Sequence, residues 1–247
     1  EELADPNIEI FYEDNQFTAK GGTDAYNKLK NVNDIDAIIT GSSQASLAIL
    51  SQTTADNVLQ MAIFATNEKY GIPNDLAFRI STTASAETIP IVEYLLAKNT
   101  QRLGILYLNN DFGVGFKDAL KEKVSTTAIK IVGEESYLLE AEDVRTQLLK
   151  LKEEKPKVIF IIGTARHFVL ILKQAKELDI KAHFMSLRSA QDPIIIKNAG
   201  EAAEGFVYSY TFDSTKEDAQ EFIDKFKVKY GREPDAYAAE GYEAYKL

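Results

Sequence analysis

Short apolar runs typical of β-strands alternate with amphipathic helical patterns along almost the whole of this 247-residue chain. Runs such as LGILYL and VIFII are apolar at successive positions, which indicates sheets covered on both faces. The sequence therefore predicts an α/β fold with parallel sheets flanked by helices. The predicted strands are residues 8–12, 37–40, 60–64, 102–108, 129–132, 158–162, 183–186 and 206–210, and the clearest helical patterns are residues 86–98, 115–123, 141–152 and 165–178.

Two polar stretches divide this alternation into two parts. Residues 81–85 (STTAS) precede a second strand–helix series, and residues 211–214 (TFDS) end it. A last helical segment follows the break at GREP and would return to the first part of the chain. We therefore predict a discontinuous first lobe of residues 1–82 plus 214–247 and a second lobe of residues 83–213.

The composition excludes several classes of function. The chain carries 38 acidic and 28 basic residues, a net charge of −10 that disfavours nucleic acids and anionic membranes as partners. It has no cysteine, hence no thiolate nucleophile or thiolate metal site. Its two histidines, His167 and His183, stand on different predicted elements, and a structural or surface role is favoured for each over catalysis or metal binding. Without a phosphate loop, an HExxH motif or a GxSxG motif, we expect no cofactor, no metal and no catalytic residue.

Small hydroxyl residues follow two of the predicted strands. Ser42 and Ser43 come after residues 37–40, and Thr66 comes after residues 60–64. Because ligands of open α/β sheets bind at the carboxyl ends of the strands, these residues are candidates for a polar ligand site. The alternative is that Ser43 and Thr66 cap helices, for which serine and threonine are preferred.

Eight segments, taken in order, resemble the branched-chain amino-acid-type (Leu/Ile/Val-binding protein-like) solute-binding proteins of ABC importers. They are IITGSSQASLAIL, AIFATNE, LAFRISTTASAET, RLGILYLNNDFGVGF, KVIFIIGTARHF, HFMSLRSAQDP, AAEGFVYSY and AYAAEGYEAYKL. The resemblance implies a type I periplasmic binding fold, in which two Rossmann-like lobes close on a small molecule by hinge rotation. It further implies a monomer that serves ABC permease subunits from a periplasmic or other extracytoplasmic location, with or without a lipid anchor.

The resemblance also assigns ligand-binding residues. Ser43 (or Ser42, if the register is shifted by one), the backbone of Ala65, and Thr66 match groups that hold an amino acid's carboxylate, and Phe112 matches a pocket aromatic. Two positions depart from the family pattern. Arg188 stands where amino-acid binders have an acidic residue that pairs with the ligand ammonium, and Ala165 replaces a pocket tyrosine, which brings Arg166 nearby.

A guanidinium donates hydrogen bonds to a carboxylate and repels an ammonium. The hypothesis is therefore a carboxylate-bearing organic acid or amino-acid-like ligand, with a neutral carbonyl-rich ligand as an alternative. Arg188 could instead be a surface arginine on a shifted loop, and Arg166 fits a helix surface better than a ligand contact. A ligand-sensing domain of a signalling receptor is the alternative function. Against the family pattern, the chain also looks truncated at both ends, and its first lobe is expected to lack a central strand.

Overall fold

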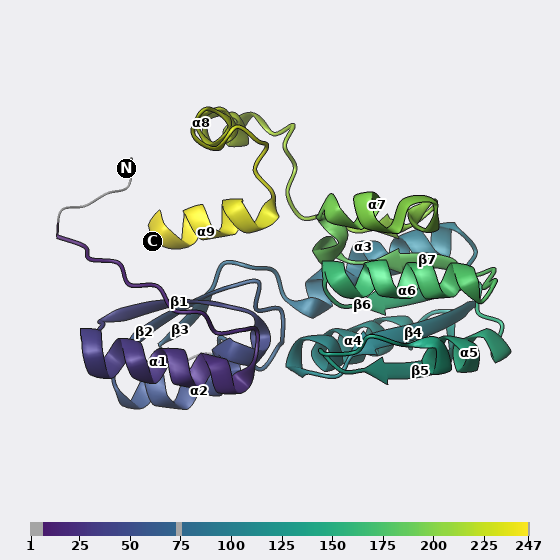
Figure 1. The fold of residues 1–247 in the computed structure, drawn as a ribbon, viewed down its shortest axis with the longest axis horizontal. Coiled ribbons are helices and arrows are strands. Elements are labelled where there is room, and N and C mark those ends of the chain that lie inside the picture. The colour runs from purple at the N-terminus through teal and green to yellow at the C-terminus, as the bar shows by residue number, and fades with distance from the viewer. Residues whose placement is uncertain (1–6, 73–75, 247) are drawn as a thin grey trace. The chain divides into compact units, whose positions relative to one another are not determined.

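The computed structural model describes residues 7–72 and 76–246, and these residues have an α/β fold, as the sequence predicts. The chain forms two compact units (Figure 1). Unit 1 consists of Glu1–Thr83 and Phe212–Leu247, and unit 2 is Ala84–Thr211. That the two units act as lobes around a ligand remains a prediction. No helix in the described part is both long and apolar enough to cross a membrane.

Unit 2 is built on a five-stranded parallel sheet with the strand order β5-β4-β6-β7-β8. Side chains of successive strand residues point to opposite faces, so each central strand supplies two cores. One face is covered by α3 and α4, and the other by α5, α6 and α7. The bounds are α3 Ala84–Ala97, β4 Arg102–Leu108, α4 Asp111–Val124, β5 Lys130–Tyr137, α5 Arg145–Glu153, β6 Val158–Ile162, α6 Ala165–Glu177, β7 His183–Ser186, η1 Arg188–Gln191, α7 Ile194–Ala199, η2 Gly200–Ala203 and β8 Val207–Tyr208.

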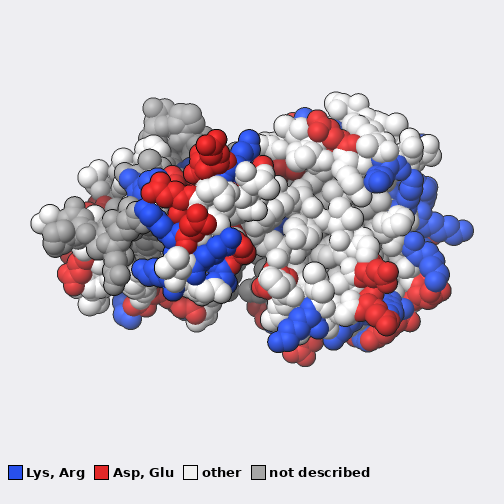
Figure 2. All heavy atoms as spheres, turned by 90° about the horizontal axis from the view of Figure 1, so that it is seen from above, with Lys and Arg blue, Asp and Glu red and all other residues white. Residues whose placement is uncertain are grey.

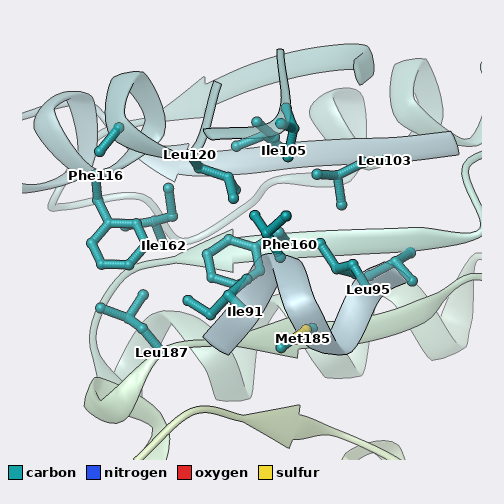
Figure 3. Close-up of a cluster of buried hydrophobic side chains, with 14 of the residues drawn as sticks. Ile91, Leu95, Leu103, Ile105, Phe116, Leu120, Phe160, Ile162, Met185 and Leu187 are labelled. Carbon is teal, nitrogen blue, oxygen red and sulfur yellow. The ribbon is translucent and has the colours of Figure 1, made fainter. Parts of the chain in front are cut away.

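The centre of unit 2 is dry and densely packed (Figure 3). All five residues of β6 are buried, and Phe160 and Phe116 stack with ring centroids 6.0 Å apart. Ile91 of α3 and Leu120 of α4 complete the same cluster on the face of the sheet that these helices cover. This core fixes where the strands end, and hence where the loops at their carboxyl ends are held.

Unit 1 has a smaller sheet, which contains β1, β2 and β3 in that order, all parallel. Helices α1 and α2 lie on one side of this sheet and α9 on the other (Figure 1). The bounds are α1 Ala19–Asn33, β1 Ala37–Gly41, α2 Ser43–Ala55, β2 Leu59–Ile63, β3 Ala77–Arg79, η3 Glu217–Ala219, α8 Gln220–Tyr230 and α9 Ala236–Lys246.

Two strand predictions need correction, and one strand was missed. Residues 8–12 have the composition of a strand but form none, because no strand among the described residues pairs with them. The predicted strand at residues 206–210 pairs with β7 only at Val207 and Tyr208. Strand β3 was not predicted, since three residues are too few to show a period.

Truncating the stacked ring of Phe160 to alanine (Phe160→Ala) should lower the free energy of unfolding by about 3–5 kcal/mol, because it leaves a cavity at the centre of the sheet. The control is Ile196→Ala on α7, where the side chain is 73% exposed and the change should stay within about 0.5 kcal/mol. Urea denaturation followed by far-ultraviolet circular dichroism measures both, since the chain has no tryptophan. Equal losses in the two variants would contradict this packing.

Candidate functional site

The two serines after β1 have different roles. Ser42 is the N-cap of α2, and its hydroxyl oxygen accepts a hydrogen bond from the Ala45 N–H at 3.3 Å. Ser43 is fully buried, and its oxygen accepts from the Asn67 N–H at 3.2 Å. The helix cap is therefore Ser42 and not Ser43, for which capping was the alternative; the Ser43 hydroxyl instead joins the end of β1 to the segment after β2.

Thr66 lies in that same segment, where no helix follows for it to cap. Its side chain is 1% exposed, and its hydroxyl has no hydrogen-bond partner among the residues that the structure describes. The backbone of its neighbour Ala65 is already engaged: the N–H donates to Ser81 Oγ at 3.0 Å, and the carbonyl accepts from the Arg79 guanidinium at 2.9 Å. A buried hydroxyl without a hydrogen-bond partner lowers the stability of the fold. Thr66 therefore differs from Ser42 and Ser43, whose hydroxyls do have partners.

The backbone is strained on both sides of these hydroxyls. Ser42 has φ 82° and Phe64 has φ 47°, values that residues other than glycine rarely adopt. Phe64 is held by its N–H, which donates to Glu240 at 3.0 Å, and by the ring of Tyr237, whose centroid is 4.8 Å away. A side chain at Gly41 would come within 2.7 Å of the Phe64 ring. Strain that the surroundings enforce in this way is common at functional sites.

A buried polar network lies beneath the two strand ends. The Thr40 and Ser46 hydroxyls are 2.7 Å apart, and the Gln60 amide donates to the Ser46 carbonyl at 2.9 Å. The Thr53 hydroxyl donates to the side-chain amide oxygen (Oε1) of Gln60 at 2.9 Å. Sequence reasoning missed these residues and Ser81, because single polar residues within apolar runs do not reveal their partners.

In unit 2 the predicted residues follow three neighbouring strands at their carboxyl ends. Phe112 is in the first turn of α4 after β4, and its ring packs near Phe116 at 6.5 Å. Ala165 begins α6 after β6 and is half-buried. Arg188 begins η1 after β7. Within unit 2 the sheet order β4-β6-β7 thus brings all three to one edge.

Arg188 is not a surface residue, so that alternative is wrong. Its side chain is 2% exposed, and its Nε lies 3.2 Å from a carboxylate oxygen of Glu87, which is equally buried in the first turn of α3. Glu87 could not be recognised as this counter-ion from the sequence, because it lies 101 positions away on a helix with an ordinary pattern. Arg166, by contrast, is exposed and donates to the Ala141 carbonyl at 3.2 Å, as expected for a helix surface.

His167 is a buried structural residue one turn into α6. Its Nδ1 lies 2.9 Å from the Thr164 hydroxyl at the N-cap, and its Nε2 lies 2.9 Å from the Leu139 carbonyl oxygen. Burial lowers the pKa of the imidazole, and the charge of Arg166 acts in the same direction, while the hydrogen bond to Leu139 opposes them. His167 thus fastens the loop after β5 to the start of α6.

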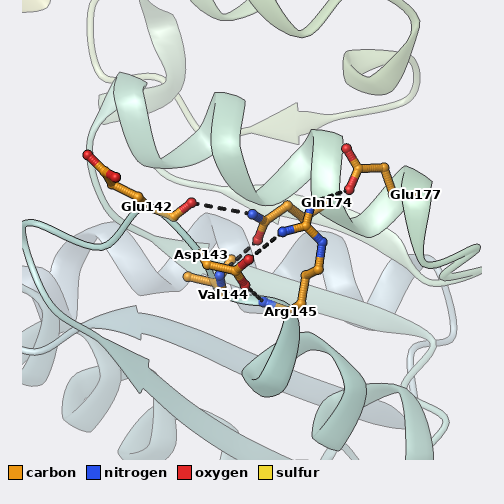
Figure 4. Close-up of polar contacts among 6 residues, drawn as sticks. All are labelled: Glu142, Asp143, Val144, Arg145, Gln174 and Glu177. Carbon is orange, nitrogen blue, oxygen red and sulfur yellow. Dashed lines mark hydrogen bonds and ion pairs between the residues drawn. The ribbon is translucent and has the colours of Figure 1, made fainter.

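The same loop is fastened a second time, further along α6 (Figure 4). The Val144 N–H donates to the side-chain amide oxygen (Oε1) of Gln174 at 2.8 Å. Arg145 forms ion pairs with both Asp143 and Glu177, so its guanidinium bridges the loop and α6. These contacts fasten the segment between β5 and α5 along the side of α6.

Charged side chains elsewhere are interspersed. On the face shown in Figure 2, basic and acidic residues occur in mixed groups, and several basic side chains also follow one another along the right-hand edge. No group of three or more His, Cys, Asp or Glu residues that could hold a metal ion occurs within residues 7–72 and 76–246.

A family model described as periplasmic binding protein matches residues 2–247. The chain belongs to the periplasmic binding protein family. The branched-chain amino-acid-type resemblance is confirmed by curated relatives. A Leu/Ile/Val-binding protein homolog 1 from Brucella suis is 26% identical over 200 residues, which cover 78% of this chain and 53% of the relative. The Leu/Ile/Val/Thr-binding protein of Salmonella typhimurium is 23% identical over 133 residues, or 53% of this chain and 36% of that protein.

Solved structures confirm the type I periplasmic binding fold. The leucine binding protein LivK from Thermotoga maritima superposes with a TM-score of 0.87 at 22% identity, over 97% of this chain and 70% of that one. The substrate binding protein LivJ from Streptococcus pneumoniae, solved in complex with isoleucine, gives a TM-score of 0.84 at 21% identity, with the same coverage. The chain spans about half the length of the first curated relative. These family members are named as binding proteins or receptors rather than enzymes.

The environment of His167 predicts a pH dependence of stability. The pKa of His167 is lowered in the folded protein and is about 6.5 when unfolded, so between about pH 7 and pH 5.5 the unfolded state binds the extra proton. The free energy of unfolding should therefore fall as the pH falls through this window. His167→Gln should remove that slope, whereas the exposed His183 offers the matched control His183→Gln, which should keep it. Chemical denaturation at several pH values measures this, and a slope that survives in His167→Gln would refute the assignment.

Proposed function

We propose that this chain is a solute-binding protein that captures a small carboxylate-bearing, amino-acid-like ligand for an ABC importer. The observation that carries the proposal is the hydroxyl cluster after β1 and β2, where the buried Thr66 hydroxyl lacks a partner. The Ser43 oxygen accepts from the Asn67 N–H, which leaves its own proton to donate. Two hydroxyl donors held by adjacent parallel strands suit a carboxylate.

The pairing of Arg188 with Glu87 bears on the choice between an amino acid and an organic acid. Since a carboxylate already lies 3.2 Å from the guanidinium, Arg188 does not present an isolated positive charge. Glu87 also supplies carboxylate oxygen, the acceptor that a ligand ammonium requires. The pair therefore favours an amino-acid-like ligand over a simple organic acid. The names of the Brucella and Salmonella relatives, which are amino-acid-binding proteins, support the same class of ligand.

The proposed partners are the membrane subunits of an ABC permease, served by a monomeric chain outside the cytoplasm. Family membership supports the location. Binding would involve closure of the two units on the ligand, and release would follow their reopening at the transporter.

Thr66→Val should weaken the ligand by at least about tenfold, because it removes a hydrogen bond to a charged group. It should not lower stability, since the lost hydroxyl has no partner in the described part of the chain. The matched control is Thr53→Val, which removes a buried hydroxyl that bonds to Gln60. That variant should lose stability and keep affinity. Thermal-shift screening with aliphatic amino acids and with carboxylic acids of the same carbon skeleton identifies the ligand, and calorimetry then gives the affinities.

Arg188→Ala should lower the free energy of unfolding by about 3–5 kcal/mol, because it removes the guanidinium that pairs with the buried Glu87 carboxylate. The double variant Glu87→Leu with Arg188→Met should recover most of this loss, since apolar residues of similar volume replace a buried pair well. The ligand affinity of this double variant shows whether the pair contacts the ligand or only stabilises unit 2. An unchanged affinity would show that neither side chain contacts the ligand.

A further inference from the structure

Arg79, the last residue of β3, holds the peptide group between Ala65 and Thr66. Its Nη1 donates to the Ala65 carbonyl oxygen at 2.9 Å. The guanidinium carbon lies over the ring of the fully buried Tyr70, 5.6 Å from the ring centroid. Two positions after Arg79, Ser81 Oγ accepts a hydrogen bond from the Ala65 N–H at 3.0 Å. Both backbone groups of Ala65 are therefore fixed by side chains from β3 and the residues that follow it.

The charge of Arg79 has no counter-ion at short range. Arg79 forms no ion pair within residues 7–72 and 76–246, and the Glu68 carboxylate acts on it only from a longer distance. The Arg79 side chain is half-buried, and burial lowers the pKa of the guanidinium because desolvation penalises the charged form. The group remains protonated at neutral pH. A positive charge that is partly withdrawn from water acts more strongly on nearby groups than an exposed one.

The donors that suit a ligand carboxylate in unit 1 are themselves neutral. They are the hydroxyls of Ser43 and Thr66, together with the Thr66 N–H, which donates to no residue in the part of the chain that the structure describes. In unit 2 the charge of Arg188 is offset by Glu87. In a chain with a net charge of −10, an anion at these hydroxyls requires a positive group close by, and Arg79 is hydrogen-bonded to this segment.

The Ala65 carbonyl and the Thr66 N–H belong to one planar, conjugated peptide group. A charged donor at the carbonyl draws electron density toward the oxygen, and this polarisation makes the N–H a stronger donor. We propose that Arg79 is a positioning residue that makes the hydroxyl cluster select an anionic carboxylate over a neutral carbonyl group, because it holds and polarises this peptide group. The inference rests on the function proposed above.

The backbone amide of Thr66 in the ligand-free chain tests the polarisation. In Arg79→Met, an apolar side chain of similar length still packs against the Tyr70 ring, and the Thr66 amide resonances should move to higher field. Arg79→Lys keeps the charge and should reverse part of that change. The control Ser81→Ala removes the partner of the Ala65 N–H and should move the Ala65 resonances instead. Unchanged Thr66 resonances in either folded Arg79 variant would overturn the polarisation, and thermal melts show which variants are folded.

Two probes that differ only at the carboxyl group test the selection. They are L-isoleucine, measured by calorimetry, and L-isoleucinamide, measured by competition against L-isoleucine. Arg79→Met should weaken L-isoleucine by at least about tenfold and L-isoleucinamide by less than about threefold, because only the acid loses an interaction with a charge. Arg79→Lys should keep most of the preference for the acid. Ser81→Ala loosens the same segment without removing a charge, so it should weaken both probes by the same factor.

Equal weakening of the two probes in Arg79→Met would overturn the proposal, because Arg79 would then only support the segment that carries Thr66. Failure of the proposed function has a different signature. The unaltered chain would then bind neither probe, which removes the selection as well, whereas the Thr66 amide resonances would still show whether Arg79 polarises the peptide group.

Discussion

In unit 2 helices bury the sheet on both of its faces. Strands β4 and β6 give one set of side chains to the α3–α4 side and the alternate set to the α5–α7 side, so their fully buried positions carry apolar residues only. In this sheet the candidate ligand contacts therefore lie at the strand ends. At the carboxyl ends of β4, β6 and β7 stand Phe112, Ala165 and Arg188.

The sheet of unit 1 is covered less completely than that of unit 2. The hydroxyls of Ser43 and Thr66 gather at the carboxyl ends of β1 and β2, as they would in a sheet with both faces covered. Its sheet nevertheless leaves Ile39 and Leu59 partly exposed beside an open edge. The ligand chemistry that we propose thus lies at the carboxyl ends of this small sheet.

Much of the fold could be predicted from the sequence, because the periodicity of apolar residues is a local property. The α/β class and the long strands of unit 2 follow from apolar runs, and the placement of Ser43 and Thr66 after strands follows from strand order along the chain. The pairing of strands is not local, because it depends on residues that are far apart in the sequence. Residues 8–12 look like a strand but lack a neighbour, and β3 is a strand only because β2 lies beside it. Likewise, the Arg188 position could be picked out, but Glu87 could not, since their contact depends on the packing of α3 against the sheet.

The buried polar groups divide into those that stabilise and those that cost stability. His167, Gln174 and Gln60 each have partners that fasten one element to another. The Thr66 hydroxyl has none in the described chain, and it lies beside the strained residues Ser42 and Phe64. An unpaired hydroxyl next to enforced strain is the pattern expected of a site kept for a ligand rather than for stability.

Titration of isotope-labelled protein with L-isoleucine, followed through backbone amide chemical shifts, shows whether an amino acid binds at the hydroxyl cluster. We expect saturable shifts concentrated at Ser43, Thr66 and Asn67 and at the segments that follow β4, β6 and β7. Shifts confined to the amino ends of the strands, or to the free edge of β1, would contradict the proposed function.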